Sequence, residues 1–207
     1  GLVHTVPNAI DAAAFAYREE IRDKMRLQLQ IPQDAFVIGH VGRFGHMKNH
    51  TFLLDVFEQV NKKLPSSMLL LVGEGGLQDM IKEKAAALGL VDKVIFTGNQ
   101  ADVSDYYQAM DFFVFPSVFE GLPGTVIEAQ ASGLRCLVSD SVTPEVLITE
   151  LAQAEPLSLG AGAWAANVLE RKEYVRNQMT QAIKAAGFDV SDQVKMLEKI
   201  YLQENCQ

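Results

Sequence analysis

The feature that most constrains the fold of this chain is a regular alternation of short apolar runs with longer amphipathic stretches. The runs are rich in branched and aromatic residues. They are apolar at consecutive positions, as strands covered on both faces must be. Five such runs are present: Phe36–Val41, Met68–Val72, Val94–Thr97, Phe112–Phe115 and Cys136–Ser139. Each is short enough to form one strand of a sheet.

The amphipathic stretches between these runs predict helices. In Thr51–Leu64 the apolar residues recur on one stripe, and Pro65 follows as a stop signal. The other stretches are Leu77–Leu88, Asp102–Met110 and Thr125–Ser132. Strand and helix in strict alternation imply an α/β fold, a Rossmann-like parallel sheet flanked by helices. In such sheets ligands bind beyond the carboxyl ends of the strands, so we expect the site in the loops that follow them.

Two flanks lie outside this alternation. Residues 1–35 contain the turn-like segment Pro7–Asp11 and a charged helix around Arg18–Gln30. Residues 158–207 predict helices, the last over about Ser191–Gln203 with apolar residues at helical spacing. Neither flank carries an obvious set of catalytic or ligand-binding residues.

Composition excludes several classes of protein. A formal net charge of −8 argues against a nucleic-acid partner, which needs an electropositive face. No apolar run approaches the roughly 20 residues that span a bilayer. Cys136 lies in an apolar run and predicts a buried thiol, which is typical of the reducing cytoplasm. The chain has neither an initiator Met nor a signal-peptide pattern, and we expect it to be part of a longer protein.

The loop after the first apolar run, Gly42–His50, carries two cations, Arg43 and Lys48. The planar fork of arginine and the compact charge of lysine together suit a diphosphate. Taken alone, the same pattern also fits two solvated surface cations. The histidines of this region lack a nearby carboxylate or cysteine set, so no metal site is predicted for His40, His46 and His50.

Two further loops give weaker signals. Gly73–Gly76 lets a backbone approach a ligand closely or forms a plain turn, and it lacks the GxGxxG spacing of a dinucleotide fold. After the third run, Asn99 and Gln100 offer amide groups suited to the edge of a base.

The connection after Phe112–Phe115 is the strongest feature. Glu120 and Glu128 lie eight residues apart, and Pro123 between them suits the first turn of a helix. We therefore expect Glu120 in the loop and Glu128 just over one turn into the helix, both facing one cleft. The amides of the loop and helix start point at an anion in this arrangement: Gly121, Leu122, Gly124 and Thr125. Alone, two solvated glutamates at a helix start explain the pattern equally well.

In their order and spacing, these pieces resemble the C-terminal domain of glycosyltransferase family 4, a group of retaining enzymes with the two-domain GT-B fold. The resemblance runs from about Val6 to Glu145. It rests on Gly42-Arg43, Lys48-Asn49-His50, Gly73-Glu74-Gly75, Phe96-Thr97-Gly98, Pro116-Ser117 and Glu120-x7-Glu128.

The resemblance implies a domain that binds a nucleotide-diphosphate-sugar, a UDP-sugar on family prevalence. It implies that Arg43 and Lys48 hold the diphosphate, that Glu120 contacts the transferred sugar, and that Glu128 binds the ribose hydroxyls. The remaining donor contacts that it implies are Gly42, Asn99, Gln100, Gly121, Leu122, Gly124 and Thr125. Cations and amides, instead of a metal ion or another cofactor, then stabilise the leaving diphosphate.

One position departs from the commoner family loop. Pro123 stands where that loop has glycine, and its backbone nitrogen cannot donate a hydrogen bond. The hydrogen bonds to the sugar must therefore come from Gly121, Leu122 and Gly124. The Glu-Gly-Leu-Pro version of the loop is similar to bacterial members that build capsule and exopolysaccharide. This resemblance implies transfer of a hexosyl group in the synthesis of a cell-surface glycan.

The implied organisation has three parts. Residues 1–35 lead in from an N-terminal domain that binds a saccharide or lipid-linked acceptor, residues 36–190 bind the donor, and residues 191–207 form a helix that packs back on that first domain. The full-length enzyme is expected in the cytoplasm, with peripheral association at the inner face of the membrane left open. This fragment alone is expected to bind a UDP-sugar weakly and to transfer nothing.

Three alternatives remain. A GT-B-like nucleotide-sugar epimerase or phosphorylase shares the fold but lacks the Glu120-x7-Glu128 arrangement. A non-catalytic nucleotide-binding module has the same architecture. A nicotinamide-dependent oxidoreductase is disfavoured by the missing GxGxxG.

Overall fold

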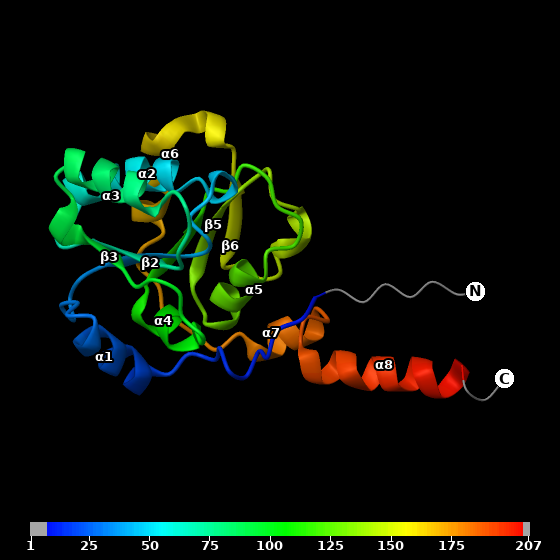
Figure 1. Cartoon of the computed structure of the whole chain (residues 1–207). Helices are drawn as coiled ribbons and strands as arrows, with labels where there is room; N and C mark the ends of the chain where they lie inside the picture. The colour runs from blue at the N-terminus through cyan, green and yellow to red at the C-terminus, as the bar shows by residue number, and fades with distance from the viewer. Residues whose placement is uncertain (1–7, 205–207) are drawn as a thin grey trace.

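The computed structural model describes residues 8–204, which form a six-stranded parallel sheet with helices on both faces (Figure 1). The strands lie in the order β3-β2-β1-β4-β5-β6, and every neighbouring pair is parallel. Their bounds are β1 Val37–Val41, β2 Met68–Val72, β3 Val94–Phe96, β4 Phe112–Phe115, β5 Arg135–Ser139 and β6 Ala152–Glu155. The predicted Rossmann-like α/β fold is confirmed.

The helices connect these strands and extend both flanks. Between the strands lie α2 His50–Lys63, α3 Gln78–Ala87, α4 Ser104–Ala109 and α5 Gly124–Ala131. The flanks contribute α1 Glu19–Gln28, α6 Gly160–Glu170, α7 Thr180–Ala185 and α8 Val190–Glu204. The predicted helices agree with these bounds to within two residues at each end.

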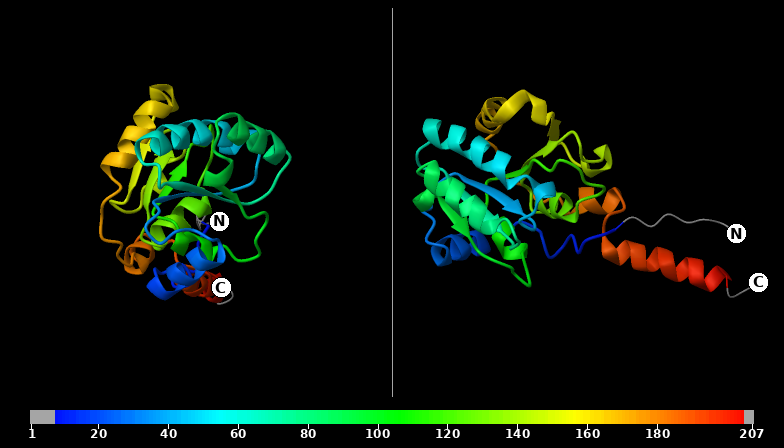
Figure 2. Two further views of the ribbon diagram at one scale, coloured as in Figure 1. Left: turned by 90° about the vertical axis from the view of Figure 1, so that its left-hand side faces the viewer. Right: turned by 45° about the horizontal axis from the view of Figure 1, so that its top comes forward.

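Alternate side chains of each central strand enter two separate cores. In β4, Phe112 and Val114 pack on the side of α2, α3 and α6, whereas Phe113 and Phe115 pack on the side of α1, α4, α5 and α7. Figure 2 shows the two helical layers on opposite sides of the sheet. Both faces of the strand are therefore covered, which is why its sequence shows no polar alternation.

The five predicted strands are confirmed to within one residue, but the sixth strand has no counterpart among the predictions. Ala152–Glu155 lies at the edge of the sheet and pairs only with β5, with Cys136 opposite Ala152. All four of its residues are only partly buried. An edge strand of this kind needs no continuous apolar run, so its sequence did not predict a strand. Cys136 itself is a buried free thiol, as predicted.

The segment before α1 pairs with the junction between α7 and α8. The backbone N–H of Ile10 donates to the Phe188 carbonyl at 3.0 Å, and that of Val190 donates to the Ile10 carbonyl at 2.9 Å. From this junction α8 projects beyond the body of the domain (Figure 1). Pro7 of the predicted turn and the residues after Glu204 lie outside the described residues. Within 8–204, no helix combines the length and the apolar character needed to span a bilayer.

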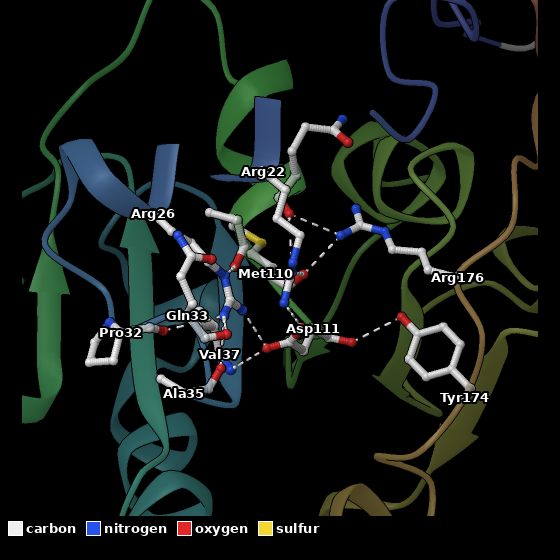
Figure 3. A network of polar contacts seen from close by, with 12 residues as sticks. Arg22, Arg26, Pro32, Gln33, Ala35, Val37, Met110, Asp111, Tyr174 and Arg176 are labelled. Carbon is white, nitrogen blue, oxygen red and sulfur yellow. Dashed lines mark hydrogen bonds and ion pairs between the residues drawn. The ribbon is translucent and has the colours of Figure 1, made fainter. Parts of the chain in front are cut away.

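A buried ion-pair network closes the amino-terminal edge of the sheet (Figure 3). Arg26 of α1 is fully buried, and its Nη2 lies 2.6 Å from Asp111 Oδ2, just before β4. Asp111 also accepts hydrogen bonds from Arg22 Nη2 at 2.6 Å and from the Val37 N–H at 2.7 Å. The network therefore joins α1 to the starts of β1 and β4, at the edge opposite the carboxyl ends of the strands.

Candidate functional site

Loops at the carboxyl ends of β1, β2 and β3 enclose a hollow of about 680 Å³. Its wall is formed by Val41, Gly42, Arg43, Val72, Gly73, Glu74, Gly75, Gln78, Asn99, Gln100 and Val103. Four of the predicted site residues therefore share one hollow: Gly42, Arg43, Asn99 and Gln100. This is the edge at which open α/β sheets bind ligands.

The polar groups of the hollow are of both signs. Arg43 and Glu74 are exposed on its wall, so a guanidinium and a carboxylate lie on neighbouring loops. The side-chain nitrogen of Gln100 donates to the Thr97 carbonyl at 2.7 Å. This hydrogen bond fixes the amide of Gln100, whereas Asn99 beside it is exposed. The hollow therefore offers one cation, one carboxylate and three side-chain amides, those of Gln78, Asn99 and Gln100, to a polar ligand.

Two glycines allow the first two loops to lie against each other. Gly73 has a φ of +132°, and a Cβ there would lie 2.3 Å from the Gly42 carbonyl oxygen. A Cβ on Gly75 would lie 2.4 Å from the Phe44 carbonyl oxygen. The sequence left open whether these glycines serve a ligand or a turn. In the structure, the absence of a side chain at these glycines lets the backbone of the neighbouring loop pack against them. This close packing holds the loop that carries Arg43.

The second part of the site is an ion pair between two predicted catalytic residues. Lys48 ends a short 3-10 turn, and its Nζ lies 2.7 Å from Glu120 Oε1 and 4.5 Å from the centre of the Phe115 ring. The side chains of Lys48 and Glu120 are only 18% and 24% exposed. The Val118 N–H donates to the Met47 carbonyl at 2.9 Å, which joins the two loops beside this pair. The loops after β1 and β4 are thus in direct contact.

Helix α5 begins at Gly124, one residue before the start of the predicted range Thr125–Ser132. Pro123 was predicted in the first helical turn, but its ψ of 111° is extended and makes it the residue before the helix. Gly124 and Thr125 are therefore the first two helical residues, and their N–H groups have no intrahelical carbonyl partner. Gly121 is exposed and Leu122 is half-buried in the loop ahead of them. The amide-rich helix start follows Glu120, as expected, but Pro123 lies outside the helix.

Glu128 lies in α5 and receives a hydrogen bond from a buried tyrosine. The Tyr107 hydroxyl of α4 lies 2.7 Å from Glu128 Oε2. Burial raises the pKa of the Glu128 carboxyl, and the hydrogen bond from Tyr107 offsets part of this effect. Glu128 does not line the hollow, although its Oε1 lies 3.9 Å from where a Cβ on Gly124 would be. The carboxylate therefore reaches back toward the start of α5.

Buried polar atoms without a hydrogen-bond partner occur on β1 and on the segments that follow β1 and β4. Within the described part of the chain there are four: His40 Nε2, His50 Nε2, Ser117 Oγ and Thr125 Oγ1. Their residues lie on β1, at the start of α2, in the loop before Glu120 and at the start of α5. Buried polar atoms are normally hydrogen-bonded, so such atoms mark places where a bound molecule or water completes the bonding.

The two buried histidines are held neutral. The rings of His40 and His50 lie edge to face, with centres 4.7 Å apart, and His40 Nδ1 lies 2.9 Å from the Val114 carbonyl oxygen. Burial, followed by the charge of Lys48, lowers the pKa of His50 to about 4, and burial lowers that of His40 well below its ordinary range. Across residues 8–204 no group of three or more His, Cys, Asp or Glu is arranged to hold a metal ion.

Sequence reasoning did not identify Tyr107. It lies within the predicted helix Asp102–Met110, where an aromatic residue at helical spacing indicates core packing, and its ring is fully buried. Only its hydroxyl belongs to the site. No short motif marks such a contact, because the partner lies on the next helix.

A parallel sheet covered on both faces, a cationic loop after β1 and two glutamates on the connection from β4 into α5 together define the Rossmann-like domain of a GT-B glycosyltransferase. The match to a known family agrees with this class. The model of the family described as glycosyl transferases group 1 matches residues 21–184, and the chain belongs to this family.

Individual relatives extend the comparison. The putative glycosyltransferase EpsF of Bacillus subtilis is 35% identical over 207 residues, which cover 96% of this chain and 53% of EpsF. An Escherichia coli enzyme, UDP-Gal:alpha-D-GlcNAc-diphosphoundecaprenol alpha-1,3-galactosyltransferase, is 30% identical over 67% of this chain and 36% of its own. The crystal structure of Anabaena HepE in complex with UDP and glucose matches with a TM-score of 0.80 at 23% identity, over 96% of this chain and 56% of HepE. The chain thus spans about half or less of the length of these proteins.

Proposed function

We propose that this chain is the donor-binding part of a retaining glycosyltransferase that transfers a hexosyl group from a UDP-sugar to a saccharide or lipid-linked acceptor. The observation that carries the proposal is the contact between Lys48 and Glu120 on the loops after β1 and β4, where some buried polar atoms lack a partner among the described residues. A cation beside a carboxylate suits a ligand that places a phosphate next to a sugar hydroxyl.

Each part of the site has a proposed role. The hollow takes the base of the nucleotide, with the amides of Asn99 and Gln100 at its edge and Arg43 toward the diphosphate. Lys48 and the N–H groups at the start of α5 neutralise the charge that develops on the leaving UDP. Glu120 contacts the transferred sugar, and Glu128 binds the ribose hydroxyls. This chemistry uses no metal ion or other cofactor.

The donor and the pathway are proposed from the relatives. The Escherichia coli relative is named for UDP-Gal, and the HepE structure holds UDP and glucose. We therefore propose UDP as the carrier. A lipid-linked acceptor and a role in exopolysaccharide or another cell-surface glycan follow the same reasoning, with peripheral contact of the whole enzyme at the inner face of the membrane. The acceptor is bound by a further domain, and this chain alone transfers no sugar.

Titration calorimetry with UDP tests the proposal. The wild-type chain is expected to bind UDP, and Arg43→Ala is expected to weaken binding by about tenfold, because an exposed guanidinium that contacts phosphate is removed. Arg18→Ala is the matched control, since Arg18 is a half-exposed arginine whose ion pair with Asp105 spans 3.8 Å. Equal UDP affinity in wild type and Arg43→Ala would contradict the diphosphate role.

The epimerase alternative makes a different prediction. An epimerase converts a UDP-sugar into its epimer without any acceptor, whereas a retaining transferase does not epimerise the sugar, with or without an acceptor. Proton NMR of a UDP-sugar incubated with the full-length protein distinguishes the two. Appearance of the epimer in the absence of acceptor would replace the proposed function.

A further inference from the structure

Tyr107 makes a short, directed contact with one oxygen of Glu128. Its hydroxyl lies 2.7 Å from Glu128 Oε2 and 3.1 Å from the Thr125 carbonyl oxygen. A phenol has a single proton to donate, and a hydrogen bond to a carboxylate is stronger and shorter than one to a neutral carbonyl. The distances therefore identify Glu128 as the main acceptor.

The Tyr107 ring is held by packing against other aromatic rings, and its backbone is held by a hydrogen bond. Tyr107 is fully buried, with its ring centre 5.7 Å from that of Phe15 and 5.8 Å from that of Phe113. Its backbone carbonyl accepts a hydrogen bond from Arg176 Nη2 at 2.9 Å. Arg176 Nε donates to the Ser132 carbonyl, just after α5, at 2.6 Å. One half-buried arginine thus ties the helix of Tyr107 to the helix of Glu128.

The two oxygens of Glu128 have different surroundings. Oε2 accepts the Tyr107 hydrogen bond, while Oε1 accepts none from a described residue and lies near Gly124 at the start of α5. A glutamate has three side-chain torsions, and holding one oxygen restricts them before a ligand arrives. A group that is held in place beforehand loses less entropy on binding.

We propose that Tyr107 is a positioning residue, which holds Oε2 of Glu128 so that Oε1 meets the ribose hydroxyls of the donor. The inference rests on the proposed donor role of Glu128. The alternative is a purely structural role, in which the hydrogen bond to Glu128 only gives the buried Tyr107 hydroxyl a partner inside the core. In that case its removal changes stability and has no particular effect on the ribose.

The test compares UDP with 2′,3′-dideoxy-UDP, which lacks both ribose hydroxyls. Tyr107→Phe keeps the ring and removes only the hydroxyl, so we expect about tenfold weaker UDP binding by calorimetry. Affinity for the dideoxy nucleotide is expected to stay the same, because that ligand makes no contact with Glu128. Tyr174→Phe is the matched control: it removes the hydroxyl of a half-buried tyrosine, which donates to the Asp111 carbonyl at 2.9 Å on the opposite edge of the sheet. Neither affinity is expected to change in that variant.

A second variant isolates the pair. In a Glu128→Gln background, Tyr107→Phe is expected to change UDP affinity by less than about twofold, since the charged acceptor is already gone. Equal loss of affinity for both nucleotides in Tyr107→Phe, or unchanged affinity for both, would overturn the inference while UDP still binds the wild type. A wild-type chain that binds neither nucleotide would instead overturn the proposed function and this inference with it.

Discussion

The ammonium of Lys48 lies 2.7 Å from Glu120 Oε1, so two residues with separate proposed roles in donor binding neutralise each other. Lys48 is proposed to meet the diphosphate, and Glu120 the sugar. For both roles to operate, donor binding must exchange this ion pair for contacts with the ligand. The free energy of breaking a partly buried pair then opposes binding.

This exchange predicts an unusual effect of Glu120→Gln. Removing the negative charge frees Lys48, so affinity for UDP is expected to rise by about threefold, while the advantage of a UDP-sugar over UDP falls. Calorimetry at low salt measures both affinities. Glu170→Gln, at the exposed end of α6, is the control. A lower or unchanged UDP affinity in Glu120→Gln would show that the ion pair does not compete with the diphosphate.

The buried pair between Arg26 and Asp111 predicts a large loss of stability in Asp111→Asn. The guanidinium of Arg26 is fully buried, and without the carboxylate its charge is uncompensated. We expect about 3–5 kcal/mol lower free energy of unfolding in urea. Asp105→Asn is the comparison, because its pair with Arg18 spans 3.8 Å and is about half-exposed, and we expect a loss below about 1 kcal/mol there. Similar losses in the two variants would contradict this account.

The neutral state of His50 predicts acid sensitivity. Its pKa is about 4 in the folded chain against about 6.5 when unfolded, so the unfolded state binds more protons between these values. Stability therefore falls as pH drops through this window, and His50 alone accounts for about 2 kcal/mol at pH 5. Urea unfolding of wild type and His50→Phe at pH 7.5 and 5.0 measures this contribution. Equal losses of stability in the two proteins would rule out His50 as a source, although His40 contributes in the same direction.

The close approach of two loops predicts that Gly73→Ala is disruptive. A Cβ there meets the Gly42 carbonyl oxygen at 2.3 Å, and the φ of +132° is strained for alanine. We expect roughly 2 kcal/mol or more lower stability and weaker UDP binding, because the loop that carries Arg43 must shift. Gly76→Ala, with no atom within 4 Å of its Cβ position, is expected to stay within about 0.5 kcal/mol of wild type. Two variants of equal stability would show that this contact is not tight.

Most of the fold could be predicted because its signals are local. Runs such as Phe112–Phe115 and stripes such as that of Thr51–Leu64 reflect how each segment is covered, and strict alternation leaves few topologies. The sixth strand, Ala152–Glu155, escaped prediction because its sequence contains no apolar run, and its four residues are only partly buried. Pro123 was placed one residue too far into α5, since proline suits both the first turn and the residue before it.

The sequence by itself determined the fold class, five of the six strands and the edge of the sheet where the chemically distinctive residues gather. Only the tertiary structure decided which of these residues meet. Lys48 contacts Glu120, and Tyr107 contacts Glu128, across elements that are brought together by the sheet and by residues that join helices, such as Arg176. Residue pattern reports how each segment is buried, whereas contacts between segments depend on how whole elements pack. The contacts of single residues therefore follow from the folded chain and not from the pattern of any one segment.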